Sequence, residues 1–170
     1  RQVRFVLVLF LISFLFSCNH EKEEVSGTIT MKEHKLIDEY DGLLHSVKDI
    51  DSLYFFTDKY EQMLLKKEAP PEVLVKLYHR AANKFYAYSK YEVAKEYFQK
   101  AEQTYLMAGD TLMSIKMRGN QAVLLDLQGH YKESIKTFLE ISDYFQKTND
   151  TLPLAFAYSN IGVIYEEMKN

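Results

Sequence analysis

The side chains that most often carry catalysis or bind metals are present in this chain but form no recognisable site. The five histidines are His20, His34, His45, His79 and His130. They share no metal-ligand spacing with one another or with acidic residues. No glycine-rich phosphate loop, nucleophile elbow or pair of catalytic carboxylates is recognisable either. The sequence therefore predicts a protein that is not an enzyme and that needs no metal or cofactor; an active site assembled from distant residues is the alternative.

The single cysteine, Cys18, is the one side chain at which we expect covalent chemistry. Residues 1–17 carry two arginines and then an apolar run too short to cross a bilayer comfortably, a pattern typical of a secretory signal peptide. The sequence Leu15-Phe16-Ser17-Cys18 resembles the lipobox of bacterial lipoproteins, in which the cysteine is acylated and becomes the new N-terminus. Several acyl chains would hold the protein stably on a membrane. An uncleaved N-terminal anchor, with Cys18 incidental, is the alternative.

Composition limits the class of partner. Removing residues 1–17 also removes Arg1 and Arg4 and takes the formal charge from −3 to −5, which argues against nucleic acid as a partner of this segment. With 47% hydrophobic residues, 14% aromatic residues and three prolines, the remainder is long enough for one well-buried, mostly helical domain. Residues 18–31 are polar and short of large apolar side chains, so we expect a lipidated tether there.

From Lys32 onward, apolar residues recur at intervals of three and four, which is the period of an α-helix. Residues 32–68 predict a capping or degenerate pair of helices, with Asp49 or Asp51 as the cap of the second. Prolines at 70 and 71 end this pair, because proline breaks a preceding helix and suits the first turn of the next. Beyond them the pattern predicts further helices, including 112–127 and 131–147.

Two stretches of the chain align at a spacing of 40 residues. Gly109-Asp110-Thr111-Leu112 matches Asn149-Asp150-Thr151-Leu152, and Asn120-Gln121-Ala122-Val123 matches Asn160-Ile161-Gly162-Val163. Such self-similarity is the signature of stacked copies of one helix pair. Within 69–170 we expect copies at 71–109, 110–149 and 150–170. The last copy is incomplete, so we expect more chain beyond Asn170.

These copies resemble the tetratricopeptide motif. In the first copy the matching residues are Ala81, Ala82, Phe85, Ser89, Tyr91, Ala94, Phe98 and Ala101; in the third they are Tyr158, Asn160, Ile161, Gly162 and Tyr165. The resemblance implies an all-α, right-handed solenoid of helical hairpins, although the period of 40 exceeds the family's usual period of about 34. The order of signal, tether and repeats is also similar to repeat-containing lipoproteins and sensor proteins of the Bacteroidetes.

The resemblance also implies where a ligand would bind, because in tetratricopeptide proteins the first helices of successive pairs line a concave face. The matching positions are Lys76, His79, Asn83 and Tyr86 in the first copy, Lys116, Asn120, Val123 and Asp126 in the second, and Phe156, Asn160, Val163 and Glu166 in the third. Asn120 and Asn160 stand out, since an asparagine offers both a donor and an acceptor to the main chain of an extended peptide. The alternative is that these asparagines bond a neighbouring helix or face water.

The sequence thus favours a non-enzymatic scaffold of the bacterial cell envelope, held at the periplasmic or outer-membrane face by an N-terminal lipid, that binds a protein or peptide. A second interpretation is the sensory region of a signalling regulator whose effector domain lies beyond this chain. Glycan capture by the 13 tyrosines ranks third, because the connections between helices are short. The identity of the partner and the oligomeric state are left open.

Overall fold

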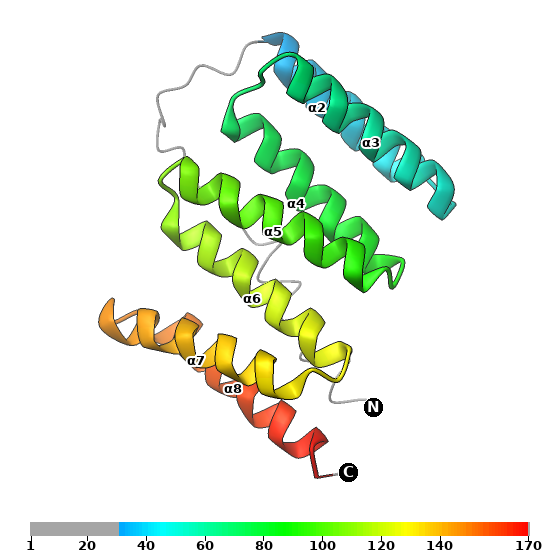
Figure 1. Ribbon diagram of the computed structural model, residues 1–170. Coiled ribbons are helices and arrows are strands. Elements are labelled where there is room, and N and C mark those ends of the chain that lie inside the picture. The colour runs from blue at the N-terminus through cyan, green and yellow to red at the C-terminus, as the bar shows by residue number, and fades with distance from the viewer. Residues whose placement is uncertain (1–30, 170) are drawn as a thin grey trace. The chain divides into compact units, whose positions relative to one another are not determined.

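The computed structural model describes the backbone of residues 31–169, and the side chains of these residues apart from 32–34 and 45. They form seven α-helices and no strand (Figure 1). The helices are α2 (Met31–Ser46), α3 (Ile50–Lys66), α4 (Pro71–Ala87), α5 (Tyr91–Met107), α6 (Thr111–Leu127), α7 (Tyr131–Lys147) and α8 (Thr151–Glu167). They pack mainly with their sequence neighbours, as in an array of helical hairpins. The prediction of an all-α fold is confirmed.

Three predicted features lie outside the described residues: the signal peptide at 1–17, Cys18, and the tether at 18–31 up to its last residue. That last residue, Met31, is the first residue of α2. The predicted helix pair at 32–68 corresponds to α2 and α3.

The helices recur at a fixed interval of 40 residues. The first residues of α2, α4, α6 and α8 are Met31, Pro71, Thr111 and Thr151. The first residues of α5 and α7 are Tyr91 and Tyr131. The repeated interval predicted from the sequence is therefore an interval between helices of the same kind. Every residue of one helix therefore has an equivalent residue 40 positions later in the chain.

Helix boundaries follow from residues with special backbone or capping roles. Asp49, and not Asp51, caps α3: its Oδ1 accepts the Ser52 N–H at 2.8 Å, and this bond holds the pKa of the Asp49 carboxyl below its usual value. Asp110 caps α6 in the same way through the Met113 N–H. Gly109 and Gly129 adopt φ of 79° and 81° at the ends of α5 and α6, where a side chain would be strained. Helices α5 and α6 therefore stop where the sequence provides a glycine.

The described chain divides within α7 into two compact units. One contains α2 to α6 and the start of α7 up to Thr137; the other contains the rest of α7, from Phe138, and α8.

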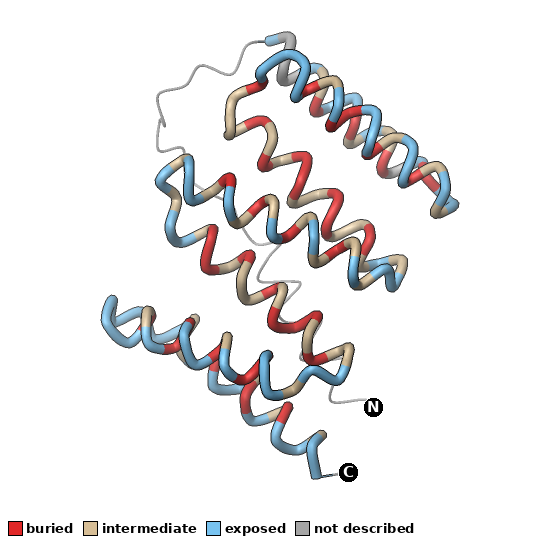
Figure 2. The backbone as a smooth tube through the Cα atoms, in the orientation of Figure 1, coloured by how far each residue is buried: buried red, intermediate tan, exposed pale blue. Residues whose placement is uncertain are grey.

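The core of the larger unit is built where α4 and α5 meet. Ala81, Ala82, Ala94 and Ala101 are all 0% exposed, and Phe85 stacks on the Tyr97 ring with centroids 5.6 Å apart. Figure 2 shows buried residues along much of α4. Small side chains let the two helix backbones approach, and the aromatic rings fill the space beside them.

A buried carboxylate links this pair to the preceding helix. Glu61 on α3 is only 7% exposed, and it accepts hydrogen bonds from the Tyr97 hydroxyl at 3.0 Å and from Lys100 Nζ at 2.6 Å, both on α5. The Lys100 ammonium also lies 5.5 Å from the centre of the Tyr78 ring on α4. Burial and the Glu61 charge raise the pKa of Tyr78 to about 12, so this hydroxyl stays protonated. Glu61 thus links α3 to α5, and Lys100 extends this contact to Tyr78 on α4.

Replacing Glu61 with Ala should lower the free energy of unfolding by about 2 kcal/mol, because the Tyr97 hydroxyl and Lys100 lose their acceptor inside the fold. Urea denaturation of the full chain would measure the change. Glu140→Ala, which removes an exposed glutamate from α7, is the matched control and should stay within about 0.5 kcal/mol of the parent. Equal effects of the two substitutions would contradict the structural role of Glu61.

Candidate binding surface

The predicted ligand-facing residues of the first copy lie on α4 and are all half-buried: Lys76, His79, Asn83 and Tyr86. Among them, His79 is distinctive. Its Nε2 atom is buried and has no hydrogen-bond partner among the described residues, and its ring lies 6.4 Å from that of Phe98. Burial lowers the pKa of the His79 ring to about 4, and the charge of neighbouring Arg80 acts in the same direction. At neutral pH this ring is therefore uncharged, and its buried Nε2 atom lacks a hydrogen-bond partner among the described residues.

The predicted residues of the second copy lie on α6 and are more deeply buried. Lys116 is half-buried, whereas Asn120, Val123 and Asp126 are buried. Asn120 is 6% exposed, and its Nδ2 donor has no hydrogen-bond partner in the part of the chain that the structure describes. A buried donor without an acceptor costs about 1–3 kcal/mol. Asn120 thus carries a buried donor that none of the described residues satisfies.

The 40-residue interval makes Arg80, Asn120 and Asn160 equivalent positions on α4, α6 and α8. Arg80 Nε pairs with Asp41 Oδ1 on α2 at 2.7 Å, while its Nη1 atom is buried and has no partner among the described residues. Asn160 Nδ2 donates to the Phe156 carbonyl of its own helix at 2.7 Å. The two asparagines that looked alike in the sequence therefore differ, because the donor of Asn160 is bound and that of Asn120 is not.

Arg80 was not among the candidates predicted from the sequence, although it lies 40 residues before Asn120 and therefore at the equivalent position. Its position is occupied by asparagine in the two later copies, and comparison of residue types alone hides the equivalence. The orphan donors of Arg80 and Asn120 both belong to the larger unit. Helices α4 and α6 thus each carry an unpaired donor, and the two donors belong to residues at equivalent positions.

The predicted residues of the third copy lie on α8, in the smaller unit. Phe156, Asn160 and Val163 are half-buried and Glu166 is exposed. These residues are three or four apart, so they lie on one side of α8.

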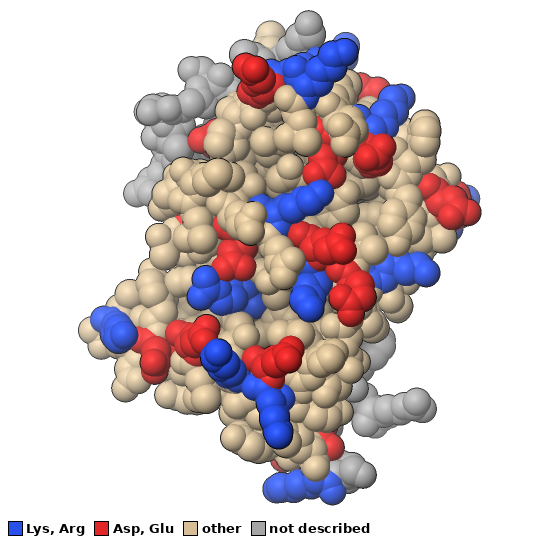
Figure 3. Space-filling model, viewed as in Figure 1, with Lys and Arg blue, Asp and Glu red and all other residues tan. Residues whose placement is uncertain are grey.

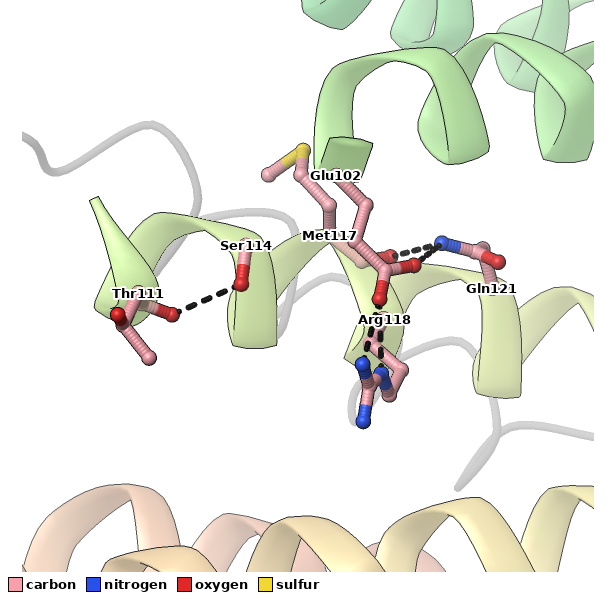
Figure 4. A network of polar contacts seen from close by, with 6 residues as sticks. All are labelled: Glu102, Thr111, Ser114, Met117, Arg118 and Gln121. Atoms are coloured by element: carbon pink, nitrogen blue, oxygen red, sulfur yellow. Dashed lines mark hydrogen bonds and ion pairs between the residues drawn. The ribbon is translucent and has the colours of Figure 1, made fainter. Parts of the chain in front are cut away.

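Polar contacts between α5 and α6 fix the orientation of the α6 face. Glu102 on α5 accepts from Arg118 Nε and Nη2, each at 2.8 Å, and from Gln121 Nε2 at 2.7 Å (Figure 4). At the far end of α6, Gln128 Nε2 donates to Glu92 Oε1 at 2.6 Å. Arg118 is partly exposed, so its ion pair adds little stability, but the branched contact sets the rotation of α6 against α5. Sequence reasoning did not identify this network.

The described residues hold no group of three or more side chains arranged to bind a metal ion. None of the described helices has the length and apolar character needed to span a bilayer. Lys and Arg are interspersed with Asp and Glu on the face shown in Figure 3, with no block of one sign. The candidate surface on α4 and α6 likewise combines charged side chains, Lys76, Lys116 and Asp126 among them, with uncharged hydrogen-bonding groups.

No protein-family model, curated protein or solved structure matches the chain. Its function therefore has to follow from its own residues and their geometry.

Lowering the pH from 6.5 toward 4 should destabilise the fold in part through His79. The folded ring takes up a proton only near pH 4, whereas the unfolded ring does so near its ordinary value of 6.5. The unfolded state therefore binds more protons in this window, and stability falls as pH falls. In His79→Gln, the melting temperature should fall less between pH 6.5 and 4 than in the parent. His130→Gln, at the exposed α6–α7 turn, is the control; a parent-like slope in His79→Gln would contradict the prediction.

Proposed function

We propose that this chain is a non-enzymatic scaffold that holds a protein or peptide on the face formed by the first helices of successive hairpins. The finer architecture that we propose is a right-handed, tetratricopeptide-like solenoid in which α4, α6 and α8 are those first helices. Two findings support it: the interval of 40 residues between equivalent helices, and the fully buried alanines where α4 meets α5. A face built from repeated helices suits an extended ligand, because equivalent positions recur along it.

The observation that carries this proposal is the unpaired Nδ2 donor of Asn120. Buried polar groups in folded proteins are nearly always hydrogen-bonded, so an orphan donor is a candidate for a ligand contact. Arg80 Nη1, at the equivalent position on α4, is a second donor, and the uncharged His79 ring is next to it. Main-chain carbonyls of a bound peptide are acceptors of the kind these groups lack.

The place where this scaffold works is proposed from the sequence alone. The signal-like residues 1–17 and the lipobox-like Cys18 support export and lipid anchoring in the cell envelope. The 12 mostly polar residues between Cys18 and α2, 19–30, would let the helices move relative to the membrane while they hold a partner.

Replacing Asn120 with Leu should abolish most partner capture and leave the fold as stable as before or more stable, because the substitution removes a buried donor that has no acceptor. Capture would be measured in the protein's own cells with a photo-reactive residue in place of Lys116 on the candidate face of α6. The same residue in place of the exposed Lys132 on α7 is the labelling control. A specific cross-linked protein or peptide is expected from position 116 only.

Asn160→Leu is the matched control variant, since its donor is already bound to its own helix and its loss should affect capture less. If Asn120→Leu lowers the melting temperature and leaves the cross-link at position 116 intact, Asn120 is a structural residue and the proposed binding face is wrong.

Replacing Cys18 with Ser should release the protein from membranes or leave an unprocessed precursor, because serine cannot form the thioether that carries the lipid. Fractionation of cells and labelling with a fatty acid would measure both. Unchanged fractionation and processing would contradict lipid anchoring at Cys18 and favour an uncleaved N-terminal anchor.

A further inference from the structure

The turn between α5 and α6 presents large apolar side chains to solvent. Leu106 and Met107, the last two residues of α5, are 48% and 74% exposed, and Leu112, the second residue of α6, is 39% exposed. Described helices precede and follow this turn, so it is interior to the chain. The repeat does not require apolar residues here. The positions 40 residues before and after Leu106 and Met107 are polar: Lys66 with Lys67, and Gln146 with Lys147.

This turn lies at the same end of the helices as the start of α2. Asp41 of α2 pairs with Arg80 of α4 at 2.7 Å, and the Tyr88 hydroxyl, where α4 ends, donates to the Val47 carbonyl just after α2 at 3.2 Å. Helices α2 and α4 therefore run in the same direction and begin at the same end of the larger unit. Helix α5 runs back along α4 and finishes at that end, as Figure 1 shows.

We name this end the proximal end; it comprises the first residue of α2 and the turns at 67–70 and 108–110. Lys66 and Lys67 are exposed where α3 ends, and the exposed Glu68 offsets one of their charges. Apolar side chains beside lysines suit the surface of a bilayer, which takes up the apolar groups and attracts cations when its lipids are anionic. The turns at the opposite end expose small or polar residues: Lys48, Asp49, Ser89, Lys90, Gly129 and His130.

The length of chain between Cys18 and α2 favours the proximal end as the one beside a membrane. Residues 19–30 number 12, and they span at most about 40 Å when fully extended. A helix of 17 residues is about 25 Å long, so the opposite end could reach the bilayer only if most of this span ran back alongside the helices.

We propose that the proximal end rests on a bilayer that contains anionic lipid, with Leu106, Met107 and Leu112 inserted between the headgroups. This inference rests on the lipid anchoring at Cys18 proposed above. It adds a second contact with the membrane, made by the folded helices themselves, and it decides which end of the scaffold points away from the membrane.

The test places a fluorophore on the full chain in vesicles of phosphatidylethanolamine and phosphatidylglycerol. Met107→Cys, labelled with an environment-sensitive dye, reports the proximal end, and Lys90→Cys reports the opposite end. Lipids with a nitroxide near the headgroup should quench the dye at position 107 about threefold more than at position 90, because apolar groups at a bilayer surface insert about 5–10 Å. The parent chain should take up no label, since a lipidated Cys18 has no free thiol.

A variant that copies the α7–α8 turn tests the apolar side chains themselves. Leu106→Gln combined with Met107→Lys introduces the residue types of Gln146 and Lys147, and a dye at Leu112→Cys then reports insertion. Quenching should fall to the level at position 90, with unchanged helical content because both replaced side chains are exposed.

Two outcomes would overturn the inference, and they separate it from lipid anchoring. Equal quenching at positions 107 and 90 in vesicle-bound chain would leave the anchoring intact and show that the proximal end does not touch the bilayer. A parent chain that accepts label at Cys18 and does not sediment with the vesicles would overturn both.

Discussion

The close approach of helices at small side chains is the constraint on which the rest of the fold depends. Ala82 and Ala94 sit where α4 meets α5 with no exposed surface, and the Phe85–Tyr97 stack forms beside them. A larger side chain at either alanine would separate the backbones and pull these rings apart, at a cost of about 1–3 kcal/mol. Once α5 occupies this side of α4, only the remaining sides are left for neighbouring helices and for ligands. His79 lies at the edge of the side that α5 covers, because its ring is 6.4 Å from the Phe98 ring of α5.

Carboxylates at successive helix contacts, one buried and one half-buried, fix the orientation of the packed helices. Glu61 joins α3 to α5, and Glu102 joins α5 to α6, each by accepting hydrogen bonds from two side chains of the other helix. Such groups add little net stability, because the free energy cost of removing the charge from water offsets most of the free energy gained from its hydrogen bonds. Their effect is on geometry: a carboxylate with two fixed donors is satisfied at one rotation of the helices and unsatisfied at others. Apolar packing alone would allow small rotations of α6 against α5. The direction of the Asn120 side chain on α6 therefore depends on the contacts of Glu102.

The helices were predictable almost to the residue, whereas the burial and hydrogen bonding of the candidate site residues were not. Prolines 70 and 71, Gly109 and Gly129 and the caps Asp49 and Asp110 are local signals, so the boundaries of α3 to α6 follow from neighbouring residues. Asn120 and Asn160 share residue type and register, yet only Asn160 bonds to its own helix. That difference depends on side-chain rotamers and on surrounding atoms distant in the sequence. The burial of His79 likewise requires a neighbour from another helix, Phe98.

The repeats keep some positions constant and vary others. Phe98 on α5 and Phe138 on α7 are both buried and chemically identical, since every copy needs them to pack. The position of Arg80 is instead arginine and then asparagine, and that of Tyr78 is tyrosine, arginine and again tyrosine. The unpaired donors of Arg80 and Asn120 lie at such a varied position, so comparison of the copies within one chain points to the side chains whose contacts differ from copy to copy.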